Sequence, residues 1–217
     1  MVYLNEHIAD IDLTEALRKV GPQRAEYALR YHRELDRRLS VAVILLLMEG
    51  LEREYGLSGP PVLAFGANGK PFLADHPEIH FNLSHCPRAA LCVLGDEAVG
   101  CDIEAVPDEL DWDVCRHCFN EAEQHSIRTA ANPLLAFTEH WTRKEAYLKW
   151  TGEGLCNDLP GLFQRATGSA APASGSPAAA PHSASGSPAS PAFPRFLTRI
   201  APDQTYVWTV CGEKLCE

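Results

Sequence analysis

The stretch VGCDIEAV, residues 99–106, places two carboxylates on an otherwise apolar segment. Its composition predicts a strand, and the side chains of a strand alternate between two faces. Asp102 and Glu104 therefore share one face, with Cα atoms about 6.6 to 7 Å apart. Their repulsion and desolvation are costly unless a cation or solvent relieves them, and Mg²⁺ prefers such oxygen ligands. The alternative is an exposed edge strand whose acids are solvated.

A second strand is predicted just upstream, where EIHFNLSH occupies residues 78–85. Asn82 and Ser84 share one face of this strand, and His85 lies on the other face if the strand continues that far. His85 precedes Cys86-Pro87, a strand terminus from which an imidazole can point into a cleft. A histidine with a pKa of about 6.5 becomes more cationic beside a phosphate. The alternative is a purely structural histidine.

A third pattern, WTRKEAYLK at residues 141–149, is typical of a helix. Glu145 and Lys149 are four positions apart and share a face with Trp141, whereas Lys144 is rotated by about 100°. Such a glutamate-lysine pair is ordinarily a solvated brace. Here the helix runs directly into TGEGL, whose glycines permit close backbone approach. The combination of an aromatic residue, two lysines, a carboxylate and these glycines favours a functional site.

Basic residues occur upstream in RRLS, with Arg37 and Arg38, and in NGKP, with Lys70. Each can be ordinary surface charge. The formal net charge is −10, which argues against nucleic acid or an anionic membrane as the main partner. An anionic ligand therefore needs a local basic patch, and these residues are the candidates.

The first half of the chain shows signals for a helix and an antiparallel sheet. Residues 27–55 are rich in Leu, Arg and Glu, contain the apolar run VAVILLLM and end before Gly56, which predicts a largely helical segment with a buried face. The Asn68-Gly69 pair predicts a hairpin turn. Two further strands are expected on either side of Gly95-Asp96.

The second half repeats this pattern. Asn120 and Glu123 have the spacing of a capping box at the start of a helix. A longer helix is expected from residue 133 to 150, and a closing hairpin is expected across Pro202-Asp203. We therefore expect an α+β fold of two pseudo-symmetric lobes, each a small antiparallel sheet packed on a long helix, with boundaries at 1–98 and 99–217.

Residues 166–192 differ from the rest of the chain, because 25 of these 27 residues are Ala, Ser, Pro or Gly and none is acidic or basic. Such a segment has too little apolar surface to offset its ordering entropy, so we expect a flexible surface insertion. It separates no domains, because strand-like sequence resumes after it.

The cysteines and the N-terminus bear on the compartment. The N-terminus lacks the basic and apolar regions of a secretory signal, which predicts a cytoplasmic location. The chain has eight cysteines, and in that location reduced packing thiols such as Cys92, Cys101 and Cys211 are expected. Cys115 and Cys118 form a lone C-x-x-C, for which a zinc or redox role is the alternative to a structural one.

Taken together, FNLSH, VGCDIE and WTRKEAYLKWTGEGL resemble the 4′-phosphopantetheinyl transferase superfamily. They occur in this order, with 15 residues between His85 and Cys101. The chain looks most like the Sfp-type, two-lobed monomeric members, and the resemblance covers nearly everything except the insertion. It implies transfer of the phosphopantetheine arm of coenzyme A to a serine of an apo acyl or peptidyl carrier protein, with release of adenosine 3′,5′-bisphosphate.

The resemblance also implies roles for individual residues. Asp102, Glu104 and Glu145 would hold Mg²⁺, with Mn²⁺ as an alternative, against the CoA pyrophosphate. Glu145, directly or through a metal-bound water, is the candidate base, and Lys149 the stabiliser of the leaving oxygen. These assignments fit a reaction in which negative charge on phosphate must be neutralised.

CoA-binding residues follow from the same resemblance. His85 would contact the 3′-phosphate, with help from Lys70 and from either Arg37 or Arg38. Lys144 and Lys149 would lie near the pyrophosphate, and Ser84 is expected to support ligand binding, since no base-and-acid pattern marks it as a nucleophile. Cys86 follows His85 where the family often has a small hydroxyl residue.

Two alternatives stay open, a catalytically silent CoA- or carrier-binding homologue and a Mg²⁺-dependent phosphohydrolase. The three carboxylates with Lys149 argue against the first, and nothing else in the chain resembles a hydrolase. The carrier is not specified by the sequence: fatty-acid, polyketide, nonribosomal-peptide and lysine-biosynthetic carriers all fit. Carriers of these classes are commonly acidic, so an acidic chain needs a locally neutral or apolar docking face.

Overall fold

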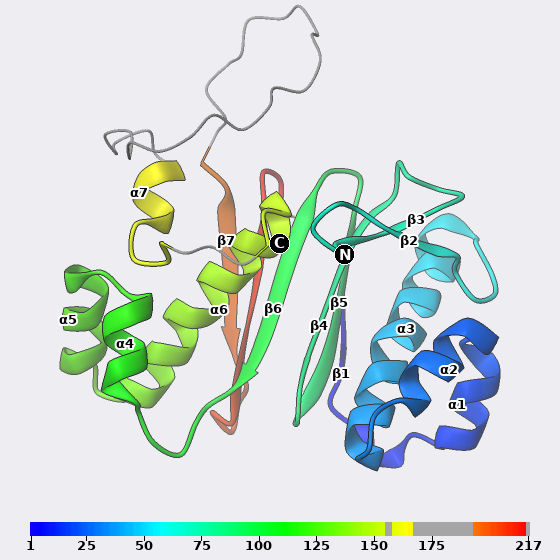
Figure 1. Ribbon diagram of the computed structural model, residues 1–217, viewed down its shortest axis with the longest axis horizontal. Coiled ribbons are helices and arrows are strands. Elements are labelled where there is room, and N and C mark those ends of the chain that lie inside the picture. Colours follow the sequence, from blue (N-terminus) through cyan, green and yellow to red (C-terminus); the bar gives the residue numbers. More distant parts are fainter. Residues whose placement is uncertain (155–157, 167–192, 216–217) are drawn as a thin grey trace, which may run out of the picture.

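The structure is a computed structural model that describes residues 1–154, 158–166 and 193–215. This part of the chain forms two three-stranded antiparallel sheets, ordered β1-β5-β4 and β6-β8-β7, and a separate β2-β3 hairpin. Figure 1 shows the two sheets in the middle of the molecule, with α1 to α3 on one side and α4 to α7 on the other. The predicted α+β class is confirmed.

The elements fall into two groups along the chain. Before residue 98 they are β1 (Val2–Asn5), the 3-10 helix η1 (Ile8–Asp10), α1 (Leu13–Lys19), α2 (Pro22–Leu29), α3 (Glu34–Tyr55), β2 (Leu63–Phe65), β3 (Pro71–Leu73), β4 (His80–Cys86) and β5 (Ala89–Gly95). After it they are β6 (Val99–Ala105), α4 (Trp112–Cys118), α5 (Glu121–Thr129), α6 (Pro133–Thr151), α7 (Leu162–Ala166), β7 (Arg195–Ile200) and β8 (Tyr206–Gly212).

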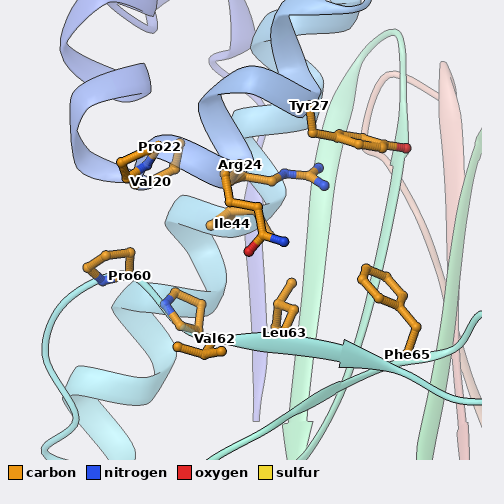
Figure 2. Close-up of a pocket in the computed structure, with 12 residues that line it drawn as sticks. Val20, Pro22, Arg24, Tyr27, Ile44, Pro60, Val62, Leu63 and Phe65 are labelled. Atoms are coloured by element: carbon orange, nitrogen blue, oxygen red, sulfur yellow. The ribbon is translucent and has the colours of Figure 1, made fainter.

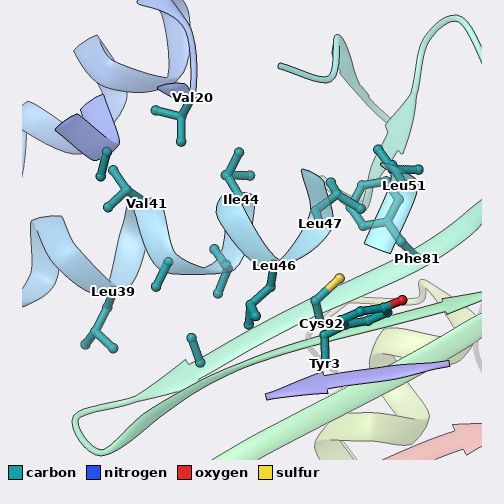
Figure 3. Close-up of a cluster of buried hydrophobic side chains, with 14 of the residues drawn as sticks. Tyr3, Val20, Leu39, Val41, Ile44, Leu46, Leu47, Leu51, Phe81 and Cys92 are labelled. Carbon is teal, nitrogen blue, oxygen red and sulfur yellow. The ribbon is translucent and has the colours of Figure 1, made fainter. Parts of the chain in front are cut away.

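Helix α3 forms the centre of the first core. Its apolar run from residue 41 to 48 is almost wholly buried, and Figure 3 shows Leu46 and Leu47 facing side chains of the first sheet such as Phe81 and Cys92. The helix ends where Gly56 adopts the left-handed conformation, with φ of 68°. Burial of this apolar face, rather than helix propensity alone, holds α3 in place.

Strand β5 joins this core to the second one, because both of its faces are buried. Cys92 and Leu94 belong to the cluster around α3, whereas Leu91 and Val93 pack with Cys101 of β6 and its neighbours. A strand covered on both sides needs a continuous apolar sequence, which is what AALCVL supplies. The two sheets are therefore packed against each other through β5 and β6.

Most sequence-predicted elements are present, but the structure also contains elements that were not predicted, among them η1 and α1. The predicted helix over 27–55 is divided, because α2 ends at Leu29 and α3 begins at Glu34. Strand β1 was not predicted; it pairs antiparallel with β5. The hairpin around Asn68-Gly69, the capping box of Asn120 and the long helix α6 are confirmed.

The described cysteines, Cys86, Cys92, Cys101, Cys115, Cys118 and Cys211, are all free and buried, as expected for packing thiols. Most of the Ala/Ser/Pro/Gly segment, residues 167–192, lies outside the described residues. Over the described ranges, the chain has no helix with the length and apolar character needed to cross a membrane.

Gly100 permits the closest backbone contact in the second half. Strand β6 lies across α6 at this point, and a Cβ atom on Gly100 would stand 2.1 Å from the Ala146 carbonyl oxygen and 2.3 Å from the Trp150 nitrogen. Both atoms belong to the backbone, so a side chain cannot move aside to make room. Glycine at this position therefore allows β6 and α6 to carry their polar side chains to a common place.

We predict that Gly100→Ala lowers the free energy of unfolding by about 1–3 kcal/mol, because the added methyl group forces α6 away from β6. Urea unfolding followed by circular dichroism measures the change. Gly66→Ala is the matched control, since its nearest neighbour would lie at an ordinary 3.7 Å. Equal stability of the two variants would contradict the close-contact explanation.

Candidate active site

Three elements carry polar side chains to one buried position between the halves. Ser84 of β4 donates a hydrogen bond to Asp102 Oδ1 of β6 at 2.9 Å. Lys149 Nζ of α6 donates to Ser84 Oγ at 2.9 Å and to Asp102 Oδ1 at 2.6 Å. We call Ser84, Asp102 and Lys149 the central cluster. It brings together one residue from each of the three sequence patterns.

Strand parity explains this convergence. Gly100, Asp102 and Glu104 alternate with the apolar residues of β6 that pack on the first sheet, so they face α6. Asn82 Oδ1 of β4 accepts a hydrogen bond from the Cys101 amide at 2.9 Å, although the backbone ladder of β6 is made with β8. Side chains of β4 thus fix its position beside β6.

Asp102 is the most deeply buried of the three predicted carboxylates, with 2% of its surface exposed. One oxygen is bonded in the central cluster, while the buried Oδ2 atom has no hydrogen-bond partner among the described residues. A buried carboxylate oxygen without a partner carries a large desolvation cost. Its environment therefore suits an additional cation.

The two neighbouring carboxylates respond to the same negative charge. Burial and then the charge of Asp102 raise the pKa of Glu104 to about 7. Burial and then Asp102 also raise the pKa of Glu145 above its usual value. Burial lowers the pKa of Lys149, but the charge of Asp102 and other acidic groups outweighs it and raises that pKa overall. The ammonium group of Lys149 thus opposes the negative charge of all three acids.

The chemistry of these carboxylates suits a divalent cation, but their positions do not form a complete coordination site. Within the described ranges, no three His, Cys, Asp or Glu side chains lie close enough together to hold a metal ion as they stand. The donor set is nevertheless composed of carboxylate oxygens, one of them buried and unpartnered, which is the kind of ligand Mg²⁺ prefers.

His85 lies on the opposite face of β4 from Ser84, as its parity predicts. Desolvation, followed by the positive charges of Lys149 and Arg24, lowers the pKa of His85, and the charge of Asp36 opposes this shift. The imidazole is partly exposed to solvent. A bound anion would reverse this shift by favouring the protonated ring.

Arg24 is the basic neighbour of His85 that the sequence patterns did not reveal. Its guanidinium donates to the Ser40 carbonyl at 2.8 Å and to Ser40 Oγ at 3.0 Å, and it lies 4.6 Å from the centroid of the Tyr27 ring. The buried Nε atom finds no acceptor in the described part of the chain. A single arginine in GPQRAEY has no periodicity or motif to mark it.

Arg24 also lines a mainly apolar cavity of about 320 Å³. Figure 2 shows Arg24 and Tyr27 on one side of this cavity and Leu63 and Phe65 of β2 on the other. The residue Phe65 is 64% exposed, which is unusual for a large aromatic residue. The cavity combines aromatic walls with a cation, a combination suited to a planar ligand that carries negative charge.

The other basic residues predicted from the sequence are engaged within the fold. Arg37 Nε donates to the Tyr31 carbonyl at 2.8 Å, and Arg38 pairs with Glu34 at 2.6 Å. Lys70 Nζ donates to the carbonyl oxygens of Val99 and Trp150. The phosphate contact expected of Lys70 stays a prediction, and Lys70 lines the same cavity as Glu145 and Lys149.

The expected position of Lys144 needs a correction. This side chain is 1% exposed and points away from the central cluster, toward α5, where Nζ pairs with Glu123 at 3.0 Å and donates to the Leu159 carbonyl at 2.8 Å. The rings of Phe119 and Phe163 lie 5.5 and 5.1 Å from the ammonium. The rotation of about 100° from Glu145 along the helix accounts for the different direction.

The C-x-x-C pair lies on α4, with Cys115 and Cys118 both buried and free. Burial raises the pKa of each thiol, which opposes a thiolate role. The described residues show no group of ligands around them that could hold a metal. The structural interpretation of the pair therefore accounts for what is seen.

Comparisons with known proteins agree with this arrangement. The family model described as "4'-phosphopantetheinyl transferase superfamily" matches residues 98–204. A 4′-phosphopantetheinyl transferase of Bacillus subtilis is 26% identical over 76% of this chain and 74% of its own length, and the transferase Sfp of B. subtilis strain 168 is 22% identical over the same shares. The transferase gsp of Aneurinibacillus migulanus is 31% identical over 63% of this chain and 57% of its own. Over residues 98–204 the chain is therefore similar to the 4′-phosphopantetheinyl transferase superfamily, and the relatives named here are all 4′-phosphopantetheinyl transferases.

We predict that Lys144→Met lowers the free energy of unfolding by about 3–5 kcal/mol, because it leaves the charge of Glu123 buried without its partner. The double variant Lys144→Met/Glu123→Gln should regain a substantial part of that loss. Lys19→Met is the control, since its pair with Glu15 is exposed and worth at most about 1 kcal/mol. A double variant no more stable than Lys144→Met would contradict the ion-pair explanation.

The pKa of about 7 at Glu104 predicts a pH dependence in metal-free protein. The folded protein keeps this proton at pH values where the unfolded chain has released it, so stability falls as pH rises from about 4.5 to 7. Urea unfolding in EDTA should show a smaller fall in Glu104→Gln than in wild type. Glu121→Gln, at an exposed acid of α5, should keep the wild-type profile. Parallel pH profiles for all three proteins would contradict the raised pKa.

Proposed function

We propose that this protein is a 4′-phosphopantetheinyl transferase, which transfers the phosphopantetheine arm of CoA to a serine of an apo carrier protein and releases adenosine 3′,5′-bisphosphate. The central cluster of Ser84, Asp102 and Lys149 carries the proposal, because it places a cation and a buried acid beside two further carboxylates. The named activity of the relatives supports the same reaction.

We further propose Asp102, Glu104 and Glu145 as the ligands of Mg²⁺. The unpartnered Asp102 Oδ2 atom and the raised pKa values of both glutamates support this assignment, since burial and the charge of Asp102 disfavour further negative charge there and a cation would relieve it. A bound Mg²⁺ would polarise the pyrophosphate and neutralise charge that develops on it.

The protein side chains would then divide the transfer between them. The serine oxygen of the carrier forms a bond to the β-phosphorus of CoA while the bond from that phosphorus to the bridging oxygen breaks. Glu145 accepts the serine proton, a role that its raised pKa favours. Lys149 stabilises the negative charge on the departing oxygen. Ser84, already bonded to Asp102, holds the cluster in place and does not act as a nucleophile.

At the nucleotide end, we propose Arg24 and His85 as the groups that receive the 3′-phosphate. Arg24 is among the positive charges that lower the pKa of His85, although Asp36 acts in the opposite direction, and the buried Nε atom of Arg24 has no acceptor among the described residues. Arg37 or Arg38 stays a further candidate for the same phosphate, although Arg37 Nε donates to the Tyr31 carbonyl and Arg38 pairs with Glu34.

The wider predictions from the sequence are kept as part of the proposal. We propose a cytoplasmic monomer whose two lobes are residues 1–98 and 99–217. Apo acyl or peptidyl carrier proteins are its proposed partners, without nucleic acid or a membrane. The phosphohydrolase alternative would use the same carboxylates, and the silent alternative would bind CoA without reaction.

The deciding assay combines the protein, Mg²⁺, CoA and an apo carrier domain, followed by intact mass spectrometry. We expect the carrier to gain one phosphopantetheine. Glu145→Gln and Asp102→Ala should each lower the rate by at least roughly 100-fold, because each removes a group from the reacting centre. Glu121→Gln should retain wild-type activity.

Circular dichroism checks that the variants remain folded. Adenosine bisphosphate released without carrier modification would favour the hydrolase alternative. CoA binding without release or transfer would favour the silent one. Unchanged transfer by folded Glu145→Gln or Asp102→Ala would contradict the assigned roles of these residues.

A further inference from the structure

Three threonine hydroxyls meet in the apolar layer between α6 and the second sheet. Thr142 Oγ1 of α6 lies 2.8 Å from Thr209 Oγ1 of β8, which lies 3.0 Å from Thr198 Oγ1 of β7. Thr142 and Thr209 are each 0% exposed, and Thr198 is half-buried. A buried hydroxyl without a hydrogen bond is costly, so these hydroxyls must satisfy one another.

The strand register explains why the hydroxyls meet. Thr209 is the partner of Asp102 on β6 and of Thr198 on β7, so the three side chains form a row across one face of the sheet. Cys211, two residues beyond Thr209 and on the same face, packs in one cluster with Ala146 of α6. The row therefore lies on the face of the sheet that α6 covers.

The protons of the hydroxyls limit how the three can be bonded, because each threonine has only one to donate. Thr142 donates its proton to the Glu139 carbonyl, in the preceding turn of α6, at 3.2 Å. It can therefore only accept from Thr209, and Thr209 in turn can only accept from Thr198. The hydrogen bonds run in one direction, from β7 through β8 into α6, and bonds in such a chain strengthen one another.

Helix α6 thus has two polar anchors on the second sheet. Lys149 is bonded to Asp102 at 2.6 Å, and Thr142 is bonded to Thr209 at 2.8 Å. At 100° per residue, Thr142, Glu145 and Lys149 fall within an arc of about 60°, and about 10 Å along the axis separates the first from the last. Glu145 lies between the two anchors on the same side of the helix, so displacement of either anchor would move its carboxylate relative to Asp102.

We infer that Thr198, Thr209 and Thr142 form a directed hydroxyl chain that fixes α6 over β8, and that they act as positioning residues for Glu145. Thr142 and Thr209 expose no surface that a substrate could touch, so they act on the reaction through the helix. This catalytic consequence rests on the proposed transferase function, whereas the existence of the chain does not.

A double-mutant cycle with isosteric valines tests the hydroxyl chain. Thr142→Val and Thr209→Val should each lower the folding equilibrium constant roughly 5- to 30-fold in urea unfolding, because each leaves a buried hydroxyl without its partner. The double variant should be at least about fivefold more stable than the product of the single effects predicts, since both partners are then removed. Thr129→Val is the control and should keep wild-type stability, because its hydroxyl also bonds a carbonyl of its own helix but is exposed.

The transfer assay tests the positioning role. In Thr142→Val, kcat should fall at least roughly 10-fold, because misplaced catalytic groups are costly. KM for CoA should stay within about twofold of wild type, since no substrate contact is lost. Thr142→Ser keeps the hydroxyl and should restore most of kcat. If circular dichroism shows that Thr142→Val does not fold, Thr198→Val interrupts the chain at its half-buried end and should lower kcat in the same direction.

Three results would overturn the inference. Stability effects that simply multiply in the double variant would show that the hydroxyls are not coupled. Wild-type kcat in folded Thr142→Val, or a Thr142→Ser variant as slow as Thr142→Val, would show that the chain does not position the catalytic group. The stability cycle needs no activity, so it tests the chain even if the wild-type protein transfers nothing and the proposed function fails.

Discussion

The carboxylate of Asp102 is 2% exposed, and one of its oxygens is held by Lys149 and Ser84 while the other has no partner among the described residues. A buried charge of this kind must be compensated by charge and hydrogen bonds from its surroundings. Three elements supply that compensation, and the absence of a side chain at Gly100 lets two of them approach. The packing of the second half therefore brings together the groups that stabilise the buried charge of Asp102. An apolar residue at position 102 could be buried without this compensation. The presence of a charged residue there is therefore better explained by a functional role.

The same concentration of acids links stability to function. Burial and the charge of Asp102 raise the pKa values of Glu104 and Glu145, so the folded protein holds protons that the unfolded chain would release. A cation bound among them would displace those protons and stabilise the fold. The proposed chemistry depends on the same excess of acidic groups. A site that attracts positive charge can hold a metal against a pyrophosphate. A glutamate with a raised pKa can accept a serine proton.

Local sequence patterns predicted what depends on periodicity and capping: the shared face of Asp102 and Glu104, the opposite parity of Ser84 and His85, and the long helix α6. They could not predict contacts between distant segments. Arg24 gains its place beside His85 only through the packing of α2 on α3. The inward direction of Lys144 depends on Glu123 of α5, and the backbone contacts of Lys70 depend on where the end of α6 lies. Helical spacing gives the direction of a side chain on its own helix, and the identity of its partner is a property of the tertiary fold.

The central claim is that Asp102, Glu104 and Glu145 bind one divalent cation at the junction of β6 and α6. Crystals grown with Mn²⁺ and CoA, measured for anomalous scattering of manganese, test it directly. We predict a single strong anomalous peak with carboxylate oxygens of all three residues at about 2.0–2.3 Å, close to the distances typical of small divalent cations. A peak elsewhere on the chain, or CoA bound with no peak among these carboxylates, would contradict the account.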